Sequence, residues 1–320
     1  MSKAAGTQYR MLANSDSFPA QSLQNFVPVS IVILGKILGE IISFEGPTMC
    51  VAGCEEVVRA ALSRRGFFRG ATAAAFVATA VAPEPVVAQE LKFRNVIDLT
   101  HTMSPEFPTF FGVPGIEMQR QFDFKKDGFN VYWWRIVEHA GTHLDAPIHF
   151  SEKGMTADQI AVSSLIVPLA VVDVTEQAGK NADYQMTRAD LEAYEKKNGR
   201  IADNACVAMN SGWARYAGDA AKFTGKDSAG GFHFPGISPD AAEWLLTQRK
   251  VAGIAVDTLS LDHGPSKDFK THYTWLPSGR WGLENVAGLD QVPASGTTLV
   301  VGASKVKDAT GGIARLFALV

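Results

Sequence analysis

Six segments after residue 90 carry the apolar side chains that a β-sheet needs. Phe93–Leu99 and Asn130–Val137 are rich in β-branched and aromatic residues, which suit a pleated strand. Four continuous apolar runs predict strands that are buried on both faces. These runs are Leu165–Val174, Ala205–Met209, Val251–Val256 and Thr297–Val301.

Two helices are predicted between these strands. Thr187, with Asp190 three residues later, has the pattern of a capping box, and the helix that begins there is expected to stop at Gly199. A second helix is predicted from Ser238 to Arg249, because the proline after Ser238 is tolerated at the first helical position. The alternation of strands and helices, without a repeat, predicts a single α/β domain.

Composition and charge exclude several classes of protein. The 320 residues are 46% hydrophobic and 20% charged, which is typical of a globular protein and excludes a disordered or coiled-coil chain. The net charge is −3 and no run of basic residues occurs, so we expect no nucleic-acid partner. The glycine pairs that begin at positions 230 and 311 are expected in loops, because neither stands in a glycine-rich turn between strand and helix.

The segment before residue 89 has the order of a twin-arginine export signal. Arg64 and Arg65 precede an apolar stretch, 70–82, and a small-residue cleavage site that ends at Ala88. We therefore expect residues 49–88 to be a cleaved signal read by the twin-arginine machinery, and residues 89–320 to be a periplasmic domain. The alternative is an Ala-rich amphipathic helix. Residues 1–48 are interpreted as a disordered, over-extended start upstream of Met49.

No stable membrane anchor is expected. The apolar segment Val27–Phe44 contains Lys36 and Glu40 and is shorter than the roughly 20 residues of a membrane helix. Cys54 follows small residues but lacks an adjacent apolar stretch, so lipidation there is not expected. Cys206 is left as the one cysteine of the predicted domain and is expected to be buried.

The candidate chemistry is concentrated between residues 139 and 150. Gly141 and Pro147 disfavour a helix there, and in an extended chain alternate side chains share a face. One face would then hold His139, His143, Asp145 and His149, and the other would turn Leu144, Ala146, Ile148 and Phe150 into the core.

Two imidazoles and a carboxylate on one face suit Zn²⁺, Mn²⁺ or Fe²⁺ and leave coordination positions open. Gly141 would allow the close backbone approach that such a site needs. The alternative is a half-polar strand whose histidines bind neighbours and solvent. Several histidines and an aspartate on one face favour the metal site.

The segment His-x-Gly-Thr-His-x-Asp-x-Pro-x-His-Phe, residues 139–150, resembles the signature of the cyclase-like metal hydrolases, the family of bacterial kynurenine formamidase and isatin hydrolase. The resemblance extends through Val96–Leu99, Phe234–Ser238 and Val256–Ser260. It implies a swivelling β/β/α fold and a homodimer or homotetramer. It also implies that a metal is bound by His139, His143 and Asp145, and that His149 is the acid/base.

The same resemblance implies a second metal position. His272 and Glu284 stand twelve residues apart, as in formamidases of the family, where Asp145 would bridge the two ions and Asn285 fits the pattern. Some members of the family work with one Mn²⁺, so one or two ions, Zn²⁺ or Mn²⁺, are expected. The alternative for His272 is a histidine in a surface loop.

Aromatic side chains near the predicted strand ends could line a substrate pocket or fill the core. Trp213 and Phe107 are the candidates for contact with a small-molecule substrate. His101, His233 and His263 stand apart from the signature and are expected to be structural or solvated.

These residues predict a metal-dependent hydrolase of a C–N amide bond in an aryl formamide, isatin or a cyclic imide-like compound. A bound divalent ion lowers the pKa of water toward about 7 and polarises a carbonyl, while His149 moves the proton. A Gly-x-Ser-x-Gly motif is absent, and no serine nucleophile is required. The alternative is a non-catalytic periplasmic protein that binds a metal and an aromatic ligand.

Overall fold

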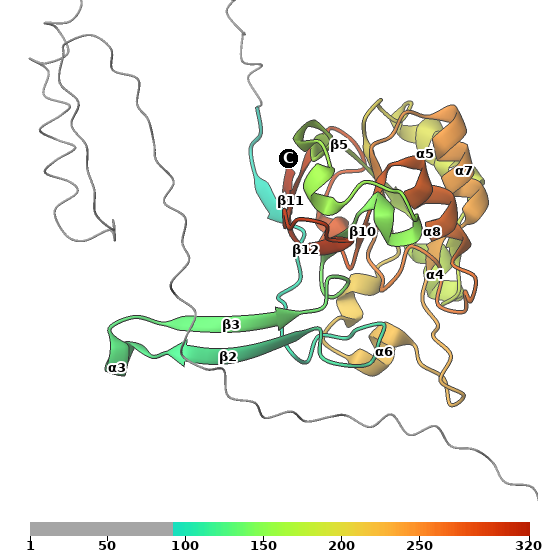
Figure 1. The fold of residues 1–320 in the computed structure, drawn as a ribbon. Coiled ribbons are helices and arrows are strands. Elements are labelled where there is room, and N and C mark those ends of the chain that lie inside the picture. Colours follow the sequence, from blue (N-terminus) through green and yellow to red (C-terminus); the bar gives the residue numbers. More distant parts are fainter. Residues whose placement is uncertain (1–91) are drawn as a thin grey trace, which may run out of the picture. The chain divides into compact units, whose positions relative to one another are not determined.

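The core of the protein is a sheet that closes on itself. The computed structural model describes residues 92–320, and within them an eight-stranded sheet runs in the order β1-β12-β11-β5-β7-β9-β10-β4, with β4 also paired to β12 (Figure 1). Its strands are β1 (Val96–Asp98), β4 (His143–Asp145), β5 (Ile166–Asp173), β7 (Cys206–Asn210), β9 (Gly253–Val256), β10 (Trp281–Glu284), β11 (Thr297–Ala303) and β12 (Gly311–Leu319). The result is a mixed α/β fold with a barrel-like sheet.

The long strand β12 makes closure possible because two short strands share one of its edges. Val96–Asp98 pairs with the end of β12, and His143–Asp145 pairs with its beginning at 311–313. Four consecutive strands of the sheet, β5, β7, β9 and β10, run parallel to one another. Strand β4 is antiparallel to both β10 and β12. The glycine pair at 311 therefore lies in a strand, and our prediction of a loop there is wrong.

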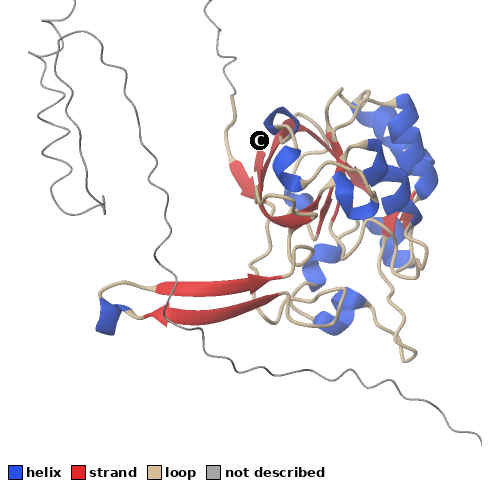
Figure 2. Cartoon of the chain, in the orientation of Figure 1, coloured by secondary structure: helices blue, strands red, loops and turns tan. Residues whose placement is uncertain are grey.

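The described residues form six helices, α3 (Phe124–Asp127), α4 (Thr175–Lys180), α5 (Arg188–Asn198), α6 (Ala220–Thr224), α7 (Pro239–Gln248) and α8 (Lys270–Trp275). Of the six helices, α4, α5, α7 and α8 pack over the parallel part of the sheet (Figure 2), whereas α3 lies at the tip of a projecting hairpin (Figure 1). The predicted capping box is confirmed, since the Thr187 side chain accepts from the Asp190 backbone N–H, and Gly199 is the C-cap. Ser238 caps α7 as predicted.

Two apolar cores lie on the two faces of the parallel strands. Val172 and Met209 pack toward α5 and α7, whereas Val171 and Ala208 belong to a second cluster inside the closed sheet. Because both faces of β5, β7 and β9 are buried, these strands show continuous apolar runs. All four predicted runs are confirmed as strands, but the fourth, β11, is antiparallel and alternates buried with half-buried residues. Cys206 is buried on the inner face, as predicted.

A hairpin of two strands projects from the body of the domain (Figure 1). It consists of β2 (Ile116–Phe122) and β3 (Val131–Ile136), joined through α3. The segment predicted as a strand at 130–137 is thus confirmed, but it belongs to this hairpin and not to the central sheet. We call the hairpin, residues 116–136, the arm.

The remaining elements are short. Strands β6 (Gln185–Met186) and β8 (Gly236–Ile237) pair with each other. The 3₁₀ helices are η1 (Pro147–Phe150), η2 (Ala157–Gln159), η3 (Val162–Ser164), η4 (Trp213–Tyr216), η5 (Leu276–Ser278) and η6 (Leu289–Gln291).

The predicted export signal and the over-extended start lie outside the described residues. Within residues 92–320, every helix is too short or too polar to cross a membrane.

Candidate active site

Strand β4 carries two of the predicted ligands, although it is only three residues long. Glu284 on β10 lies opposite His143 in the register of the sheet, so both side chains project from the same face. Asp145 lies opposite Gly311 on β12. Leu144, between the two ligands, is fully buried on the inner face. The closure of the sheet therefore places three predicted ligands together.

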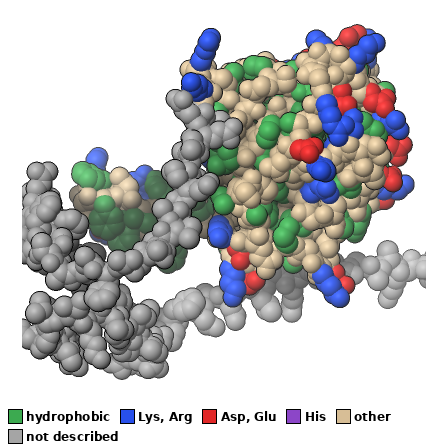
Figure 3. All heavy atoms as spheres, turned by 90° about the horizontal axis from the view of Figure 1, so that it is seen from above, with side chains coloured by type: hydrophobic (Ala, Val, Ile, Leu, Met, Phe, Trp, Pro, Cys, Tyr) green, Lys and Arg blue, Asp and Glu red, His purple; other side chains and the backbone are tan. Residues whose placement is uncertain are grey.

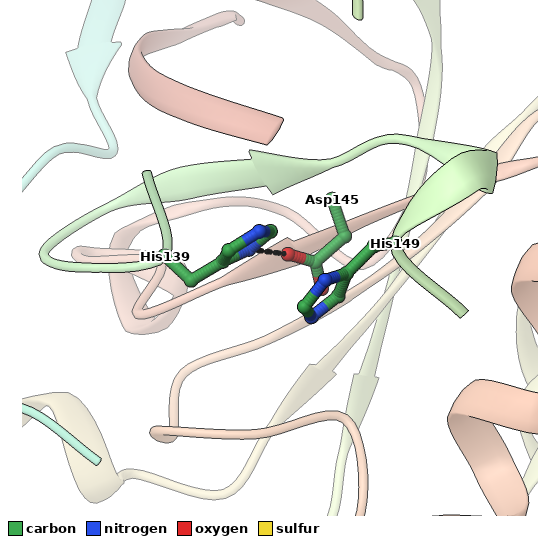
Figure 4. Close-up of side chains that lie close together, drawn as sticks. All are labelled: His139, Asp145 and His149. Carbon is green, nitrogen blue, oxygen red and sulfur yellow. Dashed lines mark hydrogen bonds and ion pairs between the residues drawn. The ribbon is translucent and has the colours of Figure 1, made fainter. Parts of the chain in front are cut away.

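Three further histidines reach the same place from other elements. His139 lies in the turn before β4, His149 in η1 and His272 in α8. The His139 Nδ1 atom is 2.7 Å from Asp145 Oδ1, and the His139 and His149 rings stack with 3.7 Å between centroids (Figure 4). The His272 Nε2 atom lies 3.1 Å from Glu284 Oε1 and 3.6 Å from Asp145 Oδ2.

The structure thus brings the acid/base candidate and all five metal-ligand candidates together. We call this set the centre: His139, His143, Asp145, His149, His272 and Glu284. Within it, Asp145 is shared by two groups whose potential ligand atoms lie within 4.8 Å of one another. One group adds His139 and His149, and the other adds His143 and Glu284. Asp145 has the place that a bridging ligand requires.

The residues of the centre converge for a different reason than the extended strand predicted from the sequence. A single extended strand would place alternate residues on one face, but the strand stops at Asp145 and residues 147–150 form η1. Leu144 and Ala146 are buried as expected. Phe150 was expected in the core facing away from the ligands, and this is wrong because the 3₁₀ turn rotates it onto His272, with 4.5 Å between ring centroids. Turns, not strand periodicity, assemble the outer ligands.

Two imidazoles of the centre are fixed by hydrogen bonds at Nδ1, the nitrogen that faces away from the carboxylates of Asp145 and Glu284. His143 Nδ1 donates to the Gly141 carbonyl at 2.8 Å, and that carbonyl also accepts from Asn285 Nδ2 at 2.9 Å. His272 Nδ1 donates to Asp262 Oδ2 at 2.6 Å. In both rings the Nε2 atom is left free to bind a cation, which is the usual arrangement of histidine ligands.

His139 is held through a hydroxyl. Its Nε2 atom lies 2.9 Å from Thr310 Oγ1, and that hydroxyl donates to Glu138 Oε2. Because a carboxylate can only accept, the hydroxyl hydrogen is used there, and Thr310 accepts from His139 Nε2. The Nδ1 atom of His139 therefore faces the centre.

Buried negative charge dominates the electrostatics of the centre. Burial alone would lower the pKa of His143, but the Asp145 and Glu284 carboxylates raise it to about 10. Burial likewise opposes a charged His272, yet Asp145 and Asp262 raise the pKa of this imidazole well above its usual value. Without a metal, two imidazolium groups therefore balance the carboxylates.

A divalent cation fits this donor set. Among the described residues, His143 Nε2 and Asp145 Oδ2 are buried side-chain atoms without a hydrogen-bond partner. Buried polar atoms are normally satisfied. These two belong to residues that, with Glu284, bring potential ligand atoms within 4.8 Å of one another, which indicates a missing cation. Imidazole and carboxylate are the donors that Zn²⁺ and Mn²⁺ accept.

The centre opens into a cavity of about 150 Å³ with an aromatic wall. The side chains that line it beside the centre are Phe110, Phe111, Phe150, Leu259, Ser260 and Phe269. The ring centroid of Phe269 lies 6.0 Å from that of Phe110 and 5.7 Å from that of Phe150. Burial lowers the pKa of His149 to about 4, so this imidazole is neutral at pH 7. A neutral proton acceptor thus stands at an apolar cavity beside a cation site.

Comparison with known proteins identifies the family of the chain. Residues 97–263 match the Cyclase family model. Isatin hydrolase of Roseibium aggregatum is 31% identical over 244 residues, which cover 71% of this chain and 92% of the relative. The solved isatin hydrolase A from Ralstonia solanacearum is 32% identical, with a TM-score of 0.67 over 71% of this chain and 92% of that one. Kynurenine formamidase of Erythrobacter litoralis is 26% identical over 69% of this chain and 92% of the relative.

The chain belongs to the cyclase family of hydrolases. The predicted family resemblance is confirmed, and so is the prediction of an enzyme. The relatives with assigned activities are hydrolases, so the comparisons give no support to a non-catalytic binding protein.

Neither aromatic residue predicted to contact substrate lines the cavity of this cyclase-family protein. Trp213 is buried with Phe107 in an apolar cluster that includes the wall residue Leu259. Its indole Nε1 donates to the Phe223 carbonyl at 2.8 Å. The Trp213 backbone N–H donates to the buried carboxylate of Asp257 at 2.9 Å, which anchors the loop after β7 to the end of β9. Phe107 packs against His101, with 5.5 Å between ring centroids.

The other histidines lie outside the centre. His101 packs between Phe107 and Phe223, and His233 hydrogen-bonds to Asp183 and Asp227. These contacts agree with the structural or solvated roles expected for His101 and His233.

Sequence reasoning missed Phe269 and Asp262. Phe269 has φ +47°, a left-handed conformation that a phenylalanine rarely adopts and that no residue pattern around it announces. Asp262 has a signal that could have been used, because it is a carboxylate ten residues before a predicted histidine ligand.

Gly311 provides the space for His139. A Cβ atom at this position would lie 2.7 Å from His139 Cε1 and 2.5 Å from the Leu144 carbonyl oxygen. Both distances are too short for real contacts, so a side chain at 311 displaces the imidazole or the strand β4. The neighbouring Gly312 is less constrained, since its Cβ would meet Ser304 Cβ at 3.2 Å.

We expect Gly311→Ala to weaken divalent-cation binding by at least about 10-fold, because the His139 ring can no longer lie against β12. Calorimetric titration of the chelator-treated protein with Zn²⁺ measures the change. Gly312→Ala is the matched control and should bind with an affinity close to that of the wild type. Wild-type affinity in Gly311→Ala would contradict the role assigned to this glycine.

Proposed function

We propose that this protein hydrolyses a C–N amide bond of a small aromatic compound, an aryl formamide, isatin or a cyclic imide-like molecule, with the help of bound Zn²⁺ or Mn²⁺. The observation that carries the proposal is the pair of unsatisfied buried atoms, His143 Nε2 and Asp145 Oδ2, in a centre whose other side chains line an aromatic cavity. The activities named for the relatives, isatin hydrolase and kynurenine formamidase, support the same bond type.

The residues of the centre would hold one or two ions. On the family resemblance, His139, His143 and Asp145 would hold the first ion, and His272 with Glu284 would hold the second. By distance alone, Asp145 also groups with His149, and His143 with Glu284. A divalent cation bound there would lower the pKa of water toward about 7 and would polarise the amide carbonyl.

His149 is the group that moves the proton. Its ring lines the cavity and stacks on His139, which fixes its plane. Because burial keeps this imidazole neutral, a ring nitrogen is free to take a proton from water and to return it to the leaving nitrogen of the amide. General acid/base help of this kind contributes roughly 10²- to 10⁴-fold to the rate.

The wall of the cavity favours a flat, apolar substrate. Phe110, Phe150 and Phe269 present ring faces and edges, which bind aromatic groups in stacked or edge-to-face geometry. Ser260 is the polar group of the wall outside the centre. The amide would then face the centre and the aromatic ring would face the phenylalanines.

The first test is turnover. The purified protein with Mn²⁺ or Zn²⁺ should hydrolyse at least one member of a panel of N-formyl anilines, isatin and cyclic imides. Tight cation binding without turnover on the whole panel would contradict the proposal and favour a binding protein.

His149→Ala should retain the metal content of the wild type and lower kcat by about 10²-fold or more, because the acid/base is removed and the ligands remain. Metal analysis and kinetics on the same samples separate the two effects. His233→Ala, which changes a histidine outside the centre, is the control and should retain activity. If His149→Ala loses its metal, the residue is a ligand and not the acid/base.

The arm supports a proposed homodimer. Trp133 and Trp134 are neighbours on β3, so their side chains project from opposite faces of the hairpin, and they are 66% and 58% exposed. Phe124 and Phe129 near the tip are also exposed, and Figure 3 shows hydrophobic side chains gathered on the arm. One face of the hairpin pairs Met118 with Trp134, and the other carries Trp133 beside Gln119 and the pair of Glu117 and Arg135. An exposed tryptophan on each face of a projecting hairpin favours a second copy of the chain as its cover.

Trp133→Ser combined with Trp134→Ser should shift the protein from dimer to monomer, because the large exposed apolar side chain on each face of the arm is removed. Light scattering after size-exclusion chromatography over a range of protein concentrations measures the mass. Val162→Ser, which changes an exposed side chain outside the arm, is the control. A monomeric wild type, or a double variant of unchanged mass, would exclude the arm as a dimer contact.

We also propose export by the twin-arginine route to the periplasm, on the basis of Arg64, Arg65 and the apolar stretch that follows. Replacing both arginines by lysine should leave the precursor in the cytoplasm, because the machinery reads the arginine pair. Fractionation and immunoblotting of the two cell compartments measure the distribution. Undiminished mature protein in the periplasm would refute the assignment.

A further inference from the structure

Asp262 is a buried carboxylate beside the centre that none of the steps above uses. It is 3% exposed and lies in the loop between β9 and α8. Its Oδ1 atom accepts from the Thr271 backbone N–H at 2.9 Å. Its Oδ2 atom accepts from the His272 backbone N–H at 3.1 Å and from His272 Nδ1 at 2.6 Å. A buried charge with this many donors is oriented by the fold.

The carboxylate determines which nitrogen of His272 carries the hydrogen. Asp262 can only accept, so Nδ1 is a donor whether the ring is neutral or protonated. Nε2 then faces Glu284 Oε1 and Asp145 Oδ2 at 3.1 and 3.6 Å, and it is the nitrogen whose proton a cation would replace. Phe150 lies against the ring of His272, which limits its rotation. His272 is therefore held with Nε2 toward the centre before any cation arrives.

The residue next to Asp262 holds the other ligand of the same position. The Leu261 backbone N–H donates to Glu284 Oε1 at 2.9 Å. Consecutive residues of one loop thus fix His272 and Glu284, whereas His139 and His143 are held elsewhere, by Thr310 and the Gly141 carbonyl. The two halves of the centre have separate supports.

The same carboxylate reaches the cavity wall. Ser266 Oγ lies 3.4 Å from Asp262 Oδ1 and accepts from the Phe269 backbone N–H at 3.2 Å. Phe269 is the wall residue with the left-handed backbone, and such conformations persist only when neighbouring contacts stabilise them. Asp262 therefore connects a metal ligand to a residue that faces the substrate.

We propose that Asp262 is a positioning residue that sets the affinity of the second cation position, His272 with Glu284, and leaves the first position unaffected. The inference rests on the proposed function in one respect, because both require that a divalent cation occupies the centre. A carboxylate partner orients an imidazole ligand and increases its basicity, and loss of such a partner weakens metal binding by roughly 10- to 100-fold.

Asp262→Asn tests this inference. The amide keeps the volume of the side chain but replaces one acceptor oxygen by a donor, which opposes an N–H of α8. Chelator-treated full-length wild type and variant are titrated with Zn²⁺ by calorimetry, and bound zinc is counted by elemental analysis. We expect two ions per wild-type chain, and in the variant an unchanged first ion and a second ion bound about 10- to 100-fold more weakly.

Two further variants separate positioning from general destabilisation. Asp268→Asn removes an exposed carboxylate of the same loop, paired with Lys270, and should bind both ions as the wild type does. His272→Ala should lose the second ion, and adding Asp262→Asn to it should cause no further loss, because Asp262 acts through the imidazole. Urea unfolding of each metal-free variant shows whether the fold is retained.

Equal affinity of wild type and Asp262→Asn for both ions would overturn the inference. Equal weakening of both ions would also overturn it, because the role would then be structural. A wild type that binds one ion, with an affinity unchanged in Asp262→Asn, would exclude a second position governed by this residue. Selective loss of the second ion in a protein that hydrolyses no amide would refute the proposed function and leave this inference standing.

Discussion

The structure around the centre depends on one buried carboxylate, Asp145. Its side chain is fully buried, and the imidazoles of His139, His143 and His272 all approach it within 3.6 Å. An isolated carboxylate in such a place is strongly unfavourable, and burial alone would raise its pKa. The three imidazoles instead hold the pKa of Asp145 well below its usual value. Positive charge is therefore a condition of the local fold, supplied by protons or by a cation.

That condition explains why a strand of three residues closes the sheet. β4 contributes few backbone hydrogen bonds, but it pairs on both sides, with β10 through Glu284 and with β12 through Gly311. Two ligands and their cross-strand neighbour Glu284 are thereby fixed by backbone pairing and not by flexible loops. Gly311 has no side chain because the His139 ring occupies the space. The side chains of the site come together because the sheet closes. The same closure buries the carboxylates of Asp145 and Glu284, and the imidazoles of the site or a cation must balance their charge.

The sequence predicted the parallel strands and the two long helices well, because burial on both faces and capping residues leave local signals. It could not predict the arm as a separate hairpin, since exposed Trp133 and Trp134 resemble the residues of a buried strand. The ligands were found from their spacing and the family resemblance, yet the extended strand invoked for them ends at Asp145. The cavity wall was the part of the site that the sequence predicted least well. Phe150 and Phe269 depend on a 3₁₀ turn and a left-handed residue, whereas Trp213 and Phe107 are buried and do not line the cavity.

Ligands and wall therefore come from different kinds of structure. Strand pairing places His143, Asp145 and Glu284, whereas the wall is built by loop segments around 110, 150, 259 and 269. Loops tolerate substitution better than paired strands do, because fewer buried contacts depend on them. A change in the wall can thus alter which aromatic compound is accepted without disturbing the charges around Asp145. Substrate choice is therefore expected to depend on the loops of the wall more than on the paired strands.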